Sequence, residues 1–148
     1  VSHPVAPRVA AEAEGTHIDL DVIHRTLQAG AAEADLTLVE GAGGWRVPLT
    51  DTADISTLAQ RCGLPVIIVA RGSLGTINHT LLSIEALRSR GVPIQGVAFI
   101  GEAIENTEAT ICRIGKVKRL GLLPILREIT PGSLLAAFGA AFDPDDFV

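Results

Sequence analysis

The sequence has no methionine, only two lysines, only two cysteines and no long run of apolar residues. Methionine is missing even at position 1, and no signal-peptide pattern follows Val1, so we expect the chain to be a part of a larger protein. The longest apolar run, residues 66–70, is far shorter than the roughly 20 residues that a membrane-spanning helix needs. This shortage of apolar runs excludes a membrane span.

The shortage of lysine and cysteine excludes further classes. The 12 basic and 17 acidic side chains give a formal net charge of −5, and lysine occurs only at 116 and 118. A nucleic-acid interface needs clustered basic side chains that displace counterions, so no nucleic-acid partner is expected. Cys62 and Cys112 are too far apart in the sequence for a disulfide framework or a zinc site. Reduced thiols of this kind predict a cytoplasmic location.

What is present favours one folded domain over residues 1–148. Hydrophobic residues make up 47% of the chain and charged residues 20%, which is the balance of an ordinary globular protein. Helical and strand-like patterns alternate after a Pro-rich opening, residues 1–10, that is expected to be a connector. Helices are expected at 19–29, 54–62, 77–90, 105–115 and 131–141, and strands at 36–39, 66–69, 96–100 and 120–123. This order predicts an α/β fold with a doubly wound, mostly parallel sheet and helices on both of its faces.

Helix boundaries follow from a few residues. Gly30 is expected to end the first helix and Gly63 the second, since glycine readily closes a helix. Asp51 and Asp54 have the spacing of caps at the start of the second helix, and Thr130 is placed as the N-cap of the last one. The acidic cluster near the C-terminus, at 143, 145 and 146, is expected to be solvated.

The first informative loop follows the expected strand 36–39. Glu40 comes directly after the strand, and Gly41, Gly43 and Gly44 follow it. Ligands of such sheets bind at the carboxyl ends of the strands, and glycines there let oxyanions approach backbone N–H groups. Glu40 would then face a metal ion or another cation; the alternative is a tight turn with a surface glutamate. Arg46 stands where a dinucleotide fingerprint needs its third glycine, so that motif is excluded.

The second loop, residues 71–79, leads from the strongest strand into an amphipathic helix. The first N–H groups of a helix have no partner inside it, and the helix dipole adds positive charge, so a carboxylate or phosphate fits there. Capping by Thr76 or Asn78 is the alternative, and both uses are compatible. The loops that begin at Ile100 and at Pro124 are equally consistent with lining an adenine or ribose and with plain connections.

Three stretches of the chain resemble dethiobiotin synthetase: residues 39–49, residues 64–69 and residues 75–80, which read VEGAGGWRVPL, LPVIIV and GTINHT. Residues 4–7 and 14–18 are also similar to that family, so the resemblance runs in order over nearly the whole chain. It implies a P-loop-type α/β enzyme of biotin synthesis that works as a homodimer. The family closes the ureido ring of dethiobiotin from 7,8-diaminononanoate, carbon dioxide and ATP, with Mg²⁺ as cofactor, by phosphorylating a carbamate that the second amine then attacks.

The resemblance also implies roles for individual residues. Glu40 matches the carboxylate that holds Mg²⁺. The residues expected against the nucleotide phosphates are Glu40, Gly41, Ala42 and Gly43, and Gly43 is also expected to contact the substrate. The backbone donors expected to bind the substrate carboxylate across the dimer interface belong to Gly75, Thr76, Ile77 and Asn78. The residues expected to line the nucleotide base are Pro124, Ile125 and Leu126.

Two departures from the family matter. Ile100 and Gly101 stand where the family often has an Asn that reads the adenine. The phosphate loop that opens the family, with its lysine, is missing, so no catalytic residue is assigned and the chain alone is expected to be inactive. It is interpreted as the C-terminal part of a larger nucleotide-binding domain, incomplete at its N-terminus. Two alternatives stay open: another P-loop synthetase or a partitioning ATPase, and a non-catalytic dimerisation module with an exposed sheet edge.

Overall fold

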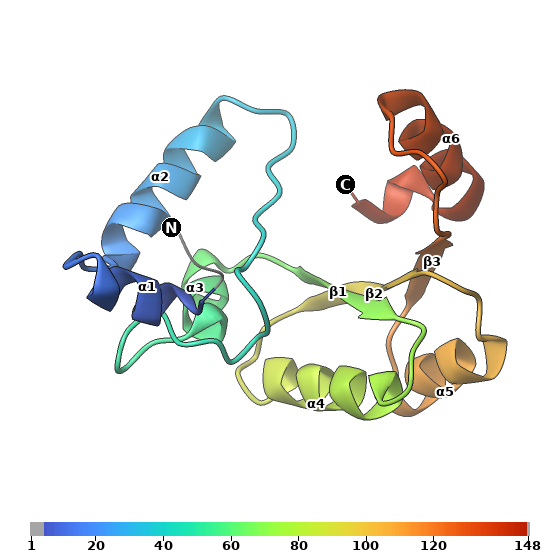
Figure 1. Ribbon diagram of the computed structural model, residues 1–148, viewed down its shortest axis with the longest axis horizontal. Coiled ribbons are helices and arrows are strands. Elements are labelled where there is room, and N and C mark those ends of the chain that lie inside the picture. Colours follow the sequence, from blue (N-terminus) through green and yellow to red (C-terminus); the bar gives the residue numbers. More distant parts are fainter. Residues whose placement is uncertain (1–4, 148) are drawn as a thin grey trace. The chain divides into compact units, whose positions relative to one another are not determined.

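The computed structural model describes residues 5–147, and the chain divides into two compact units. The N-terminal unit is Val1–Leu64, and the C-terminal unit is Pro65–Val148. Figure 1 shows the order of the elements: three helices come first, followed by strands that alternate with helices. The first unit is therefore helical, and the parallel sheet belongs to the second.

The N-terminal unit contains α1 (Pro7–Ala13), α2 (Leu20–Ala32) and α3 (Ile55–Cys62). The expected connector at residues 1–10 is wrong in part, because a helix begins at Pro7; residues 1–4, with His3, lie outside the described residues. Proline suits the first position of a helix because its missing N–H would have no partner there. The expected end of α2 at Gly30 is also wrong. The helix continues to Ala32, since an interior glycine costs only about 1 kcal/mol.

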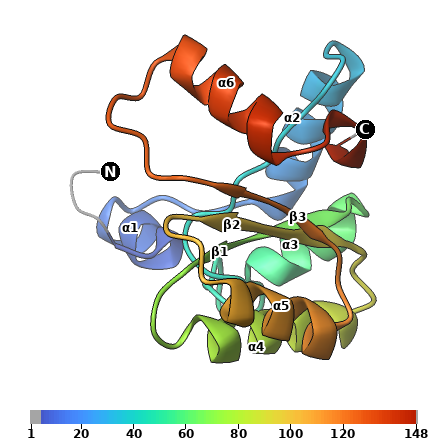
Figure 2. The ribbon, with the colours of Figure 1, turned by 90° about the vertical axis from the view of Figure 1, so that its right-hand side faces the viewer.

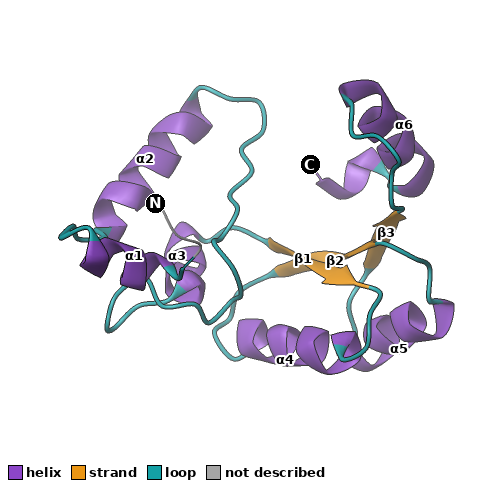
Figure 3. Ribbon diagram, in the orientation of Figure 1, coloured by secondary structure: helices purple, strands orange, loops and turns teal. Residues whose placement is uncertain are grey.

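The expected strand at residues 36–39 does not form. The whole stretch from 33 to 54 is drawn as loop in Figure 3, and Leu38 is 79% exposed. A strand needs a neighbour to pair with its backbone N–H and C=O groups, and none of the described strands pairs with these residues. The prediction of a strand at residues 36–39 is therefore wrong, because an apolar run alone does not make a sheet.

The C-terminal unit is a three-stranded parallel sheet with helical connections. Its elements are β1 (Val66–Arg71), α4 (Thr76–Arg88), β2 (Ile94–Ile100), α5 (Glu105–Gly115), β3 (Arg119–Leu123), α6 (Pro131–Ala141) and the 3₁₀ helix η1 (Pro144–Phe147). The strands lie in the order β1-β2-β3. Figure 2 shows α4 and α5 on one face of the sheet and α6 on the other. The expected α/β fold, with a parallel sheet and helices on both faces, is confirmed.

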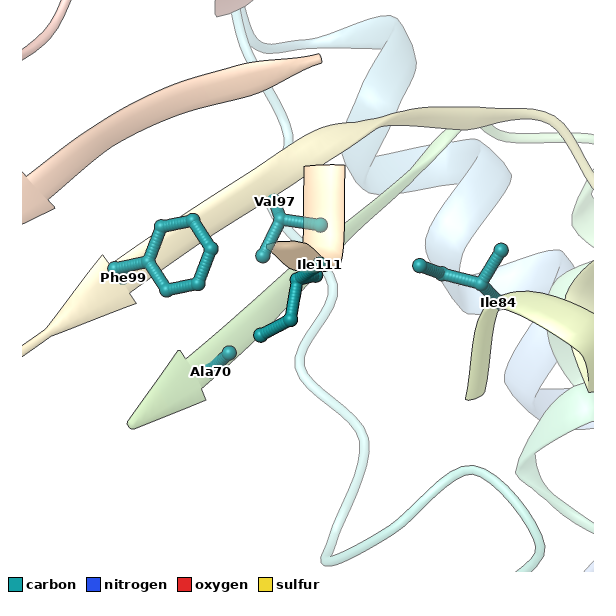
Figure 4. Close-up of a cluster of buried hydrophobic side chains, with 5 residues drawn as sticks. All are labelled: Ala70, Ile84, Val97, Phe99 and Ile111. Atoms are coloured by element: carbon teal, nitrogen blue, oxygen red, sulfur yellow. The ribbon is translucent and has the colours of Figure 1, made fainter. Parts of the chain in front are cut away.

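The core of this unit lies between the sheet and the pair α4 and α5. Ala70, Ile84, Val97, Phe99 and Ile111 form one buried cluster, drawn in Figure 4. The cluster draws on β1 and β2, and Leu122 of β3 packs against it, so all three strands present apolar side chains to the helices, as parallel strands with helical crossovers do. This packing fixes the direction in which the three strands end, and hence the loops that follow them.

The C-terminal segment packs on the other face. Gly121 of β3 has no room for a side chain, because a Cβ there would lie 2.3 Å from the carbonyl oxygen of Ala141. Phe138 and Phe142 stack with ring centroids 4.9 Å apart. Asp146 forms an ion pair with Lys118 and its side chain is only 13% exposed, so the prediction of a solvated acidic cluster is wrong for this residue. Among residues 5–147, no helix is long and apolar enough to cross a membrane.

Candidate functional site

The glycine loop, residues 40–44, is open to solvent along its whole length. Glu40, Gly41, Ala42 and Gly43 are all exposed. In the part of the chain that the structure describes, no three His, Cys, Asp or Glu side chains gather as a metal site would require. Glu40 is thus a single carboxylate at the start of a loop of small residues. That fits Mg²⁺, which usually takes one or two protein carboxylates and completes its shell with water and phosphate oxygens.

The start of α3 holds the far end of this loop. The N–H of Ile55 donates to the carbonyl of Val47, and the N–H of Ser56 donates to the carbonyl of Trp45, both at 3.1 Å. Pro48 and Asp54 form an antiparallel bridge between the same two segments. The first donors of a helix, which have no partner within it, are here used to fix the segment that follows the glycines.

Asp54 secures the helix start itself. Its carboxylate accepts hydrogen bonds from the N–H of Thr57, at 3.0 Å, and from the hydroxyl of Ser56, and it forms an ion pair with Arg46 at 3.3 Å. Burial acts to raise the pKa of Asp54, but the hydrogen bonds from Ser56 and Thr57 and the charge of Arg46 outweigh it, so the pKa lies below its usual value. The cap predicted at Asp54 is confirmed, within a full capping box, whereas that at Asp51 is wrong, because the Asp51 carboxylate pairs with Arg8.

Trp45 follows the glycines directly. Its indole Nε1 is buried and has no hydrogen-bond partner among the described residues. A buried donor without a partner costs about 1–3 kcal/mol, so tryptophan is not placed here for its N–H. It is the one tryptophan of the 148 residues. Its fluorescence therefore reports on the glycine loop.

Helix α4 begins in a different way. Its N-cap is Gly75, with φ of 90°, and no side chain caps the helix. Capping by Thr76 or Asn78, the alternative left open by the sequence, is therefore wrong. The N–H of Thr76 donates to the carbonyl of Ser73, and Asn78 is exposed. The start of a 13-residue helix is thus left uncapped by side chains, which suits an anion.

The loops after the three strands meet along the carboxyl edge of the sheet. Arg71 pairs in register with Ile100, and Ile100 with Leu123. A Cβ on Gly72 would lie 2.7 Å from the carbonyl oxygen of Glu102, so the loops after β1 and β2 touch. Pro124 and Ile125 are exposed and Leu126 is half-buried. They continue directly from β3 at this edge, which leaves them accessible to a ligand.

Both lysines lie on the opposite edge. Lys116 and Lys118 precede β3, so they belong to the end of the sheet at which the strands begin. The hydrogen bond from Lys118 to Asp146 raises the pKa of that lysine. The C-terminal unit therefore brings Gly75–Asn78 and Pro124–Leu126 to the carboxyl edge without any lysine, and Glu40–Gly43 belong to the N-terminal unit.

The two cysteines carry free thiols. Burial raises the pKa of both Cys62 and Cys112, which makes them poor nucleophiles at neutral pH. The sulfur of Cys62 lies 3.7 Å from Nδ1 of His24. No pattern in the sequence indicated this contact or the hydrogen bond from Ile55 to Val47, because both depend on how α3 packs.

Comparison with known proteins points to one family. A family model described as "AAA domain" matches residues 1–133. The chain is 48% identical over 144 residues to the "ATP-dependent dethiobiotin synthetase BioD" of Novosphingobium aromaticivorans, covering 97% of this chain and 67% of that protein. Proteins of the same name from Sphingopyxis alaskensis and Brucella ovis are 49% and 46% identical, with 97% of this chain and 68% and 66% of theirs covered. The chain spans about two thirds of the length of these curated relatives.

Proposed function

The chain belongs to the dethiobiotin synthetase family, and on that premise we propose that its protein is an ATP-dependent ligase that closes a ureido ring. The substrates are 7,8-diaminononanoate, carbon dioxide and ATP, and the product is dethiobiotin. The observation that carries this proposal is the exposed carboxylate of Glu40 at the head of a glycine loop that α3 holds in place. The identity of 46–49% to relatives of that name supports it.

Glu40 is proposed as the protein's ligand to Mg²⁺. The ion, when bound, neutralises charge on the phosphoryl group that is transferred. Gly41, Ala42 and Gly43 have no large side chains, so phosphate oxygens can approach their backbone N–H groups closely. Gly43 has φ of 86°, a conformation that an L side chain rarely adopts, and this explains why glycine is required there. In this proposal the loop binds and orients the phosphate groups, and positioning of this kind is a large part of how proteins catalyse phosphoryl transfer.

The start of α4 is proposed to bind the substrate carboxylate. The N–H groups of Gly75, Thr76, Ile77 and Asn78 are the proposed donors, with that of Thr76 shared with the carbonyl of Ser73. The lack of a side-chain cap on this helix supports the proposal. The family binds this carboxylate across a dimer, so we also propose a homodimer. An enzyme that consumes ATP at this step is expected in the cytoplasm.

The nucleotide base is proposed to lie against Pro124, Ile125 and Leu126. Ile125 is 75% exposed, which leaves an apolar side chain free to pack on a base. Ile100 and Gly101 offer no side-chain hydrogen bond to adenine, so recognition there falls to backbone groups. The N–H of Gly101 already donates to the carbonyl of Leu123, which leaves its own carbonyl as the available group.

No lysine of this chain reaches the edge of the sheet where the ligands are proposed to bind. Lys118 is held by Asp146, and Lys116 follows α5 on the opposite edge. We therefore expect the 148-residue chain alone to bind ligands without turning them over.

The proposal is tested with the protein that the complete gene encodes. Purified protein is incubated with diaminononanoate, bicarbonate, ATP and Mg²⁺, and dethiobiotin is measured by mass spectrometry. Glu40→Gln should lower the Mg²⁺-dependent rate on the order of 100-fold, because the metal supplies several kcal/mol of charge stabilisation. The matched control is Glu33→Gln, which makes the same change in charge at an exposed residue outside the loop.

A folded wild-type protein that forms no dethiobiotin would refute the proposed function. Equal rates for Glu40→Gln and Glu33→Gln would leave the activity in place but remove Glu40 from the metal site. The same assay with other carboxylate-bearing diamines in place of diaminononanoate tests the substrate. Faster turnover of one of them would favour a different P-loop synthetase activity.

A further inference from the structure

We propose that Ile55 is a positioning residue for Glu40: its side chain forms the floor on which the glycine loop rests, beneath Gly41. The inference rests on the proposed function, since it concerns the carboxylate assigned to Mg²⁺. In this proposal Ile55 acts on that carboxylate through the backbone of Gly41, next to Glu40.

Ile55 contacts both ends of the loop. A Cβ added to Gly41 would lie 2.9 Å from Cγ2 of Ile55, closer than two carbon atoms can approach without a shift. At the other end, the N–H of the same residue donates to the carbonyl of Val47 at 3.1 Å. Ile55 therefore limits how closely the backbone at Gly41 can approach α3, and it also fixes the position of Val47, which follows the loop.

Glycine is needed at position 41 because Ile55 leaves no room for a Cβ there. Gly41 is not among the glycines with positive φ, so alanine could adopt its backbone conformation. Cγ2 of Ile55 is fixed on a β-branched side chain and cannot swing away as the end of a longer chain could. Gly44, in the same loop, has nothing within 4 Å of a would-be Cβ. The close approach of loop and helix is thus confined to the residue that adjoins Glu40.

The floor is itself well anchored. Ser56, the next residue, is fully buried and donates its N–H to the carbonyl of Trp45. Asp54, the preceding residue, closes the capping box of α3 and pairs with Arg46. Because α3 cannot shift without breaking these contacts, a methyl group added at Gly41 should displace the loop rather than the helix.

A double-mutant cycle in the protein encoded by the complete gene tests the inference. The variants are Gly41→Ala, Ile55→Ala and the double variant. One readout is the affinity for Mg²⁺ in the presence of ATP, measured by calorimetry. The other is the fluorescence emission of Trp45, obtained by subtracting the spectrum of a Trp45→Phe protein. Each single change should weaken binding on the order of tenfold, and the pair should recover to within about threefold of wild type, because removing Cγ2 makes room for the added methyl.

Ile55→Val is the matched control, because valine keeps a methyl at the Cγ2 position and should not rescue Gly41→Ala. Gly44→Ala should leave the urea midpoint unchanged. If the pair is as weak as the product of the two singles, or if Ile55→Val rescues as well as Ile55→Ala, the inference is overturned.

Two further outcomes are decisive. Should Ile55→Ala fail to fold, Gly41→Ala alone still decides, since an unchanged Trp45 emission would contradict the crowding. Should the wild-type protein fail to bind Mg²⁺ with ATP, the proposed function fails, while coupling in the Trp45 emission would still support the floor and its absence would refute it.

Discussion

Helices α3 and α4 begin in opposite ways, and the difference separates a support from a binding surface. At the start of α3 the N–H groups of Ile55 and Ser56 bond to loop carbonyls, and that of Thr57 bonds to Asp54. At the start of α4 no side chain caps the helix, and the N-cap is Gly75 in a left-handed conformation. The first donors of α3 are thus in use, whereas at α4 the N–H of Thr76 donates to the carbonyl of Ser73 and no side chain takes the donors that follow it.

The two helix N-termini also differ in whether a carboxylate offsets the positive end of the helix dipole. The dipole of α3 is met by the carboxylate of its N-cap, Asp54. The first turn of α4 contains no acidic residue. An anionic ligand would therefore find an unopposed positive end at α4 and an occupied one at α3. The comparison predicts that changes at α3 act on loop geometry and that changes at α4 act on backbone conformation and anion binding.

The largest effect is expected from Gly75→Ala. The φ of 90° at this position is left-handed, and an L residue there costs about 1–2 kcal/mol, while the nearest atom to an added Cβ, Cε1 of His79, is at an ordinary 3.8 Å. The free energy of unfolding, measured by urea denaturation, should fall by that amount. Gly132→Ala in α6, where φ is not positive and no atom lies within 4 Å, should not destabilise. Equal effects of the two changes would show that Gly75 is not held left-handed.

A smaller effect, and one that depends on pH, is expected from Asp54→Asn. Asparagine remains a good N-cap, so the loss at neutral pH is that of the Arg46 ion pair and the carboxylate charge, less than about 1 kcal/mol. The folded-state pKa of Asp54 is lowered, so its ionisation contributes stability above the ordinary pKa near 4, and this contribution is lost as pH falls through the folded-state pKa.

Urea denaturation of wild type and Asp54→Asn at several pH values checks this. The gap between the two proteins should be widest at neutral pH and should close as the solution becomes more acid than about pH 4. A gap that widens on acidification would mean that the Asp54 pKa is raised, contrary to its hydrogen bonds.

The sequence predicted the C-terminal unit well because its patterns are local and mutually consistent. The run at 66–69 and the helix that follows it are stopped by glycines and prolines, and each strand finds a parallel neighbour. The run at 36–39 carries the same kind of pattern but no described strand pairs with it. Strand pairing is a property of two segments, so one segment cannot reveal it.

The candidate site was predictable in its residue types and only partly in its arrangement. Glu40 among glycines and the start of α4 could be proposed from their order along the chain, because the groups proposed to function there are a carboxylate and backbone donors. The floor under Gly41 could not, since Ile55 is an ordinary apolar residue in a short helix and its role depends on the bonds from α3 to Trp45 and Val47. The capping pattern at Asp54 predicted that a helix starts there but not that it supports the loop.

The smallest effect is expected from Asn78→Ala, and it bears directly on whether α4 is uncapped. Alanine has a higher helix propensity than asparagine by up to about 0.7 kcal/mol, and Asn78 is exposed at the third position of α4 without capping it. The free energy of unfolding should therefore stay the same or rise by a few tenths of a kcal/mol. Thr130→Ala at α6, where the side chain does accept the N–H of Ser133, should lose about 1 kcal/mol in the same assay. Because loss of a cap and gain of helix propensity change the stability in opposite directions, a loss at Asn78 close to that at Thr130 would mean that α4 is capped in solution, and the contrast between the two helix termini would then disappear.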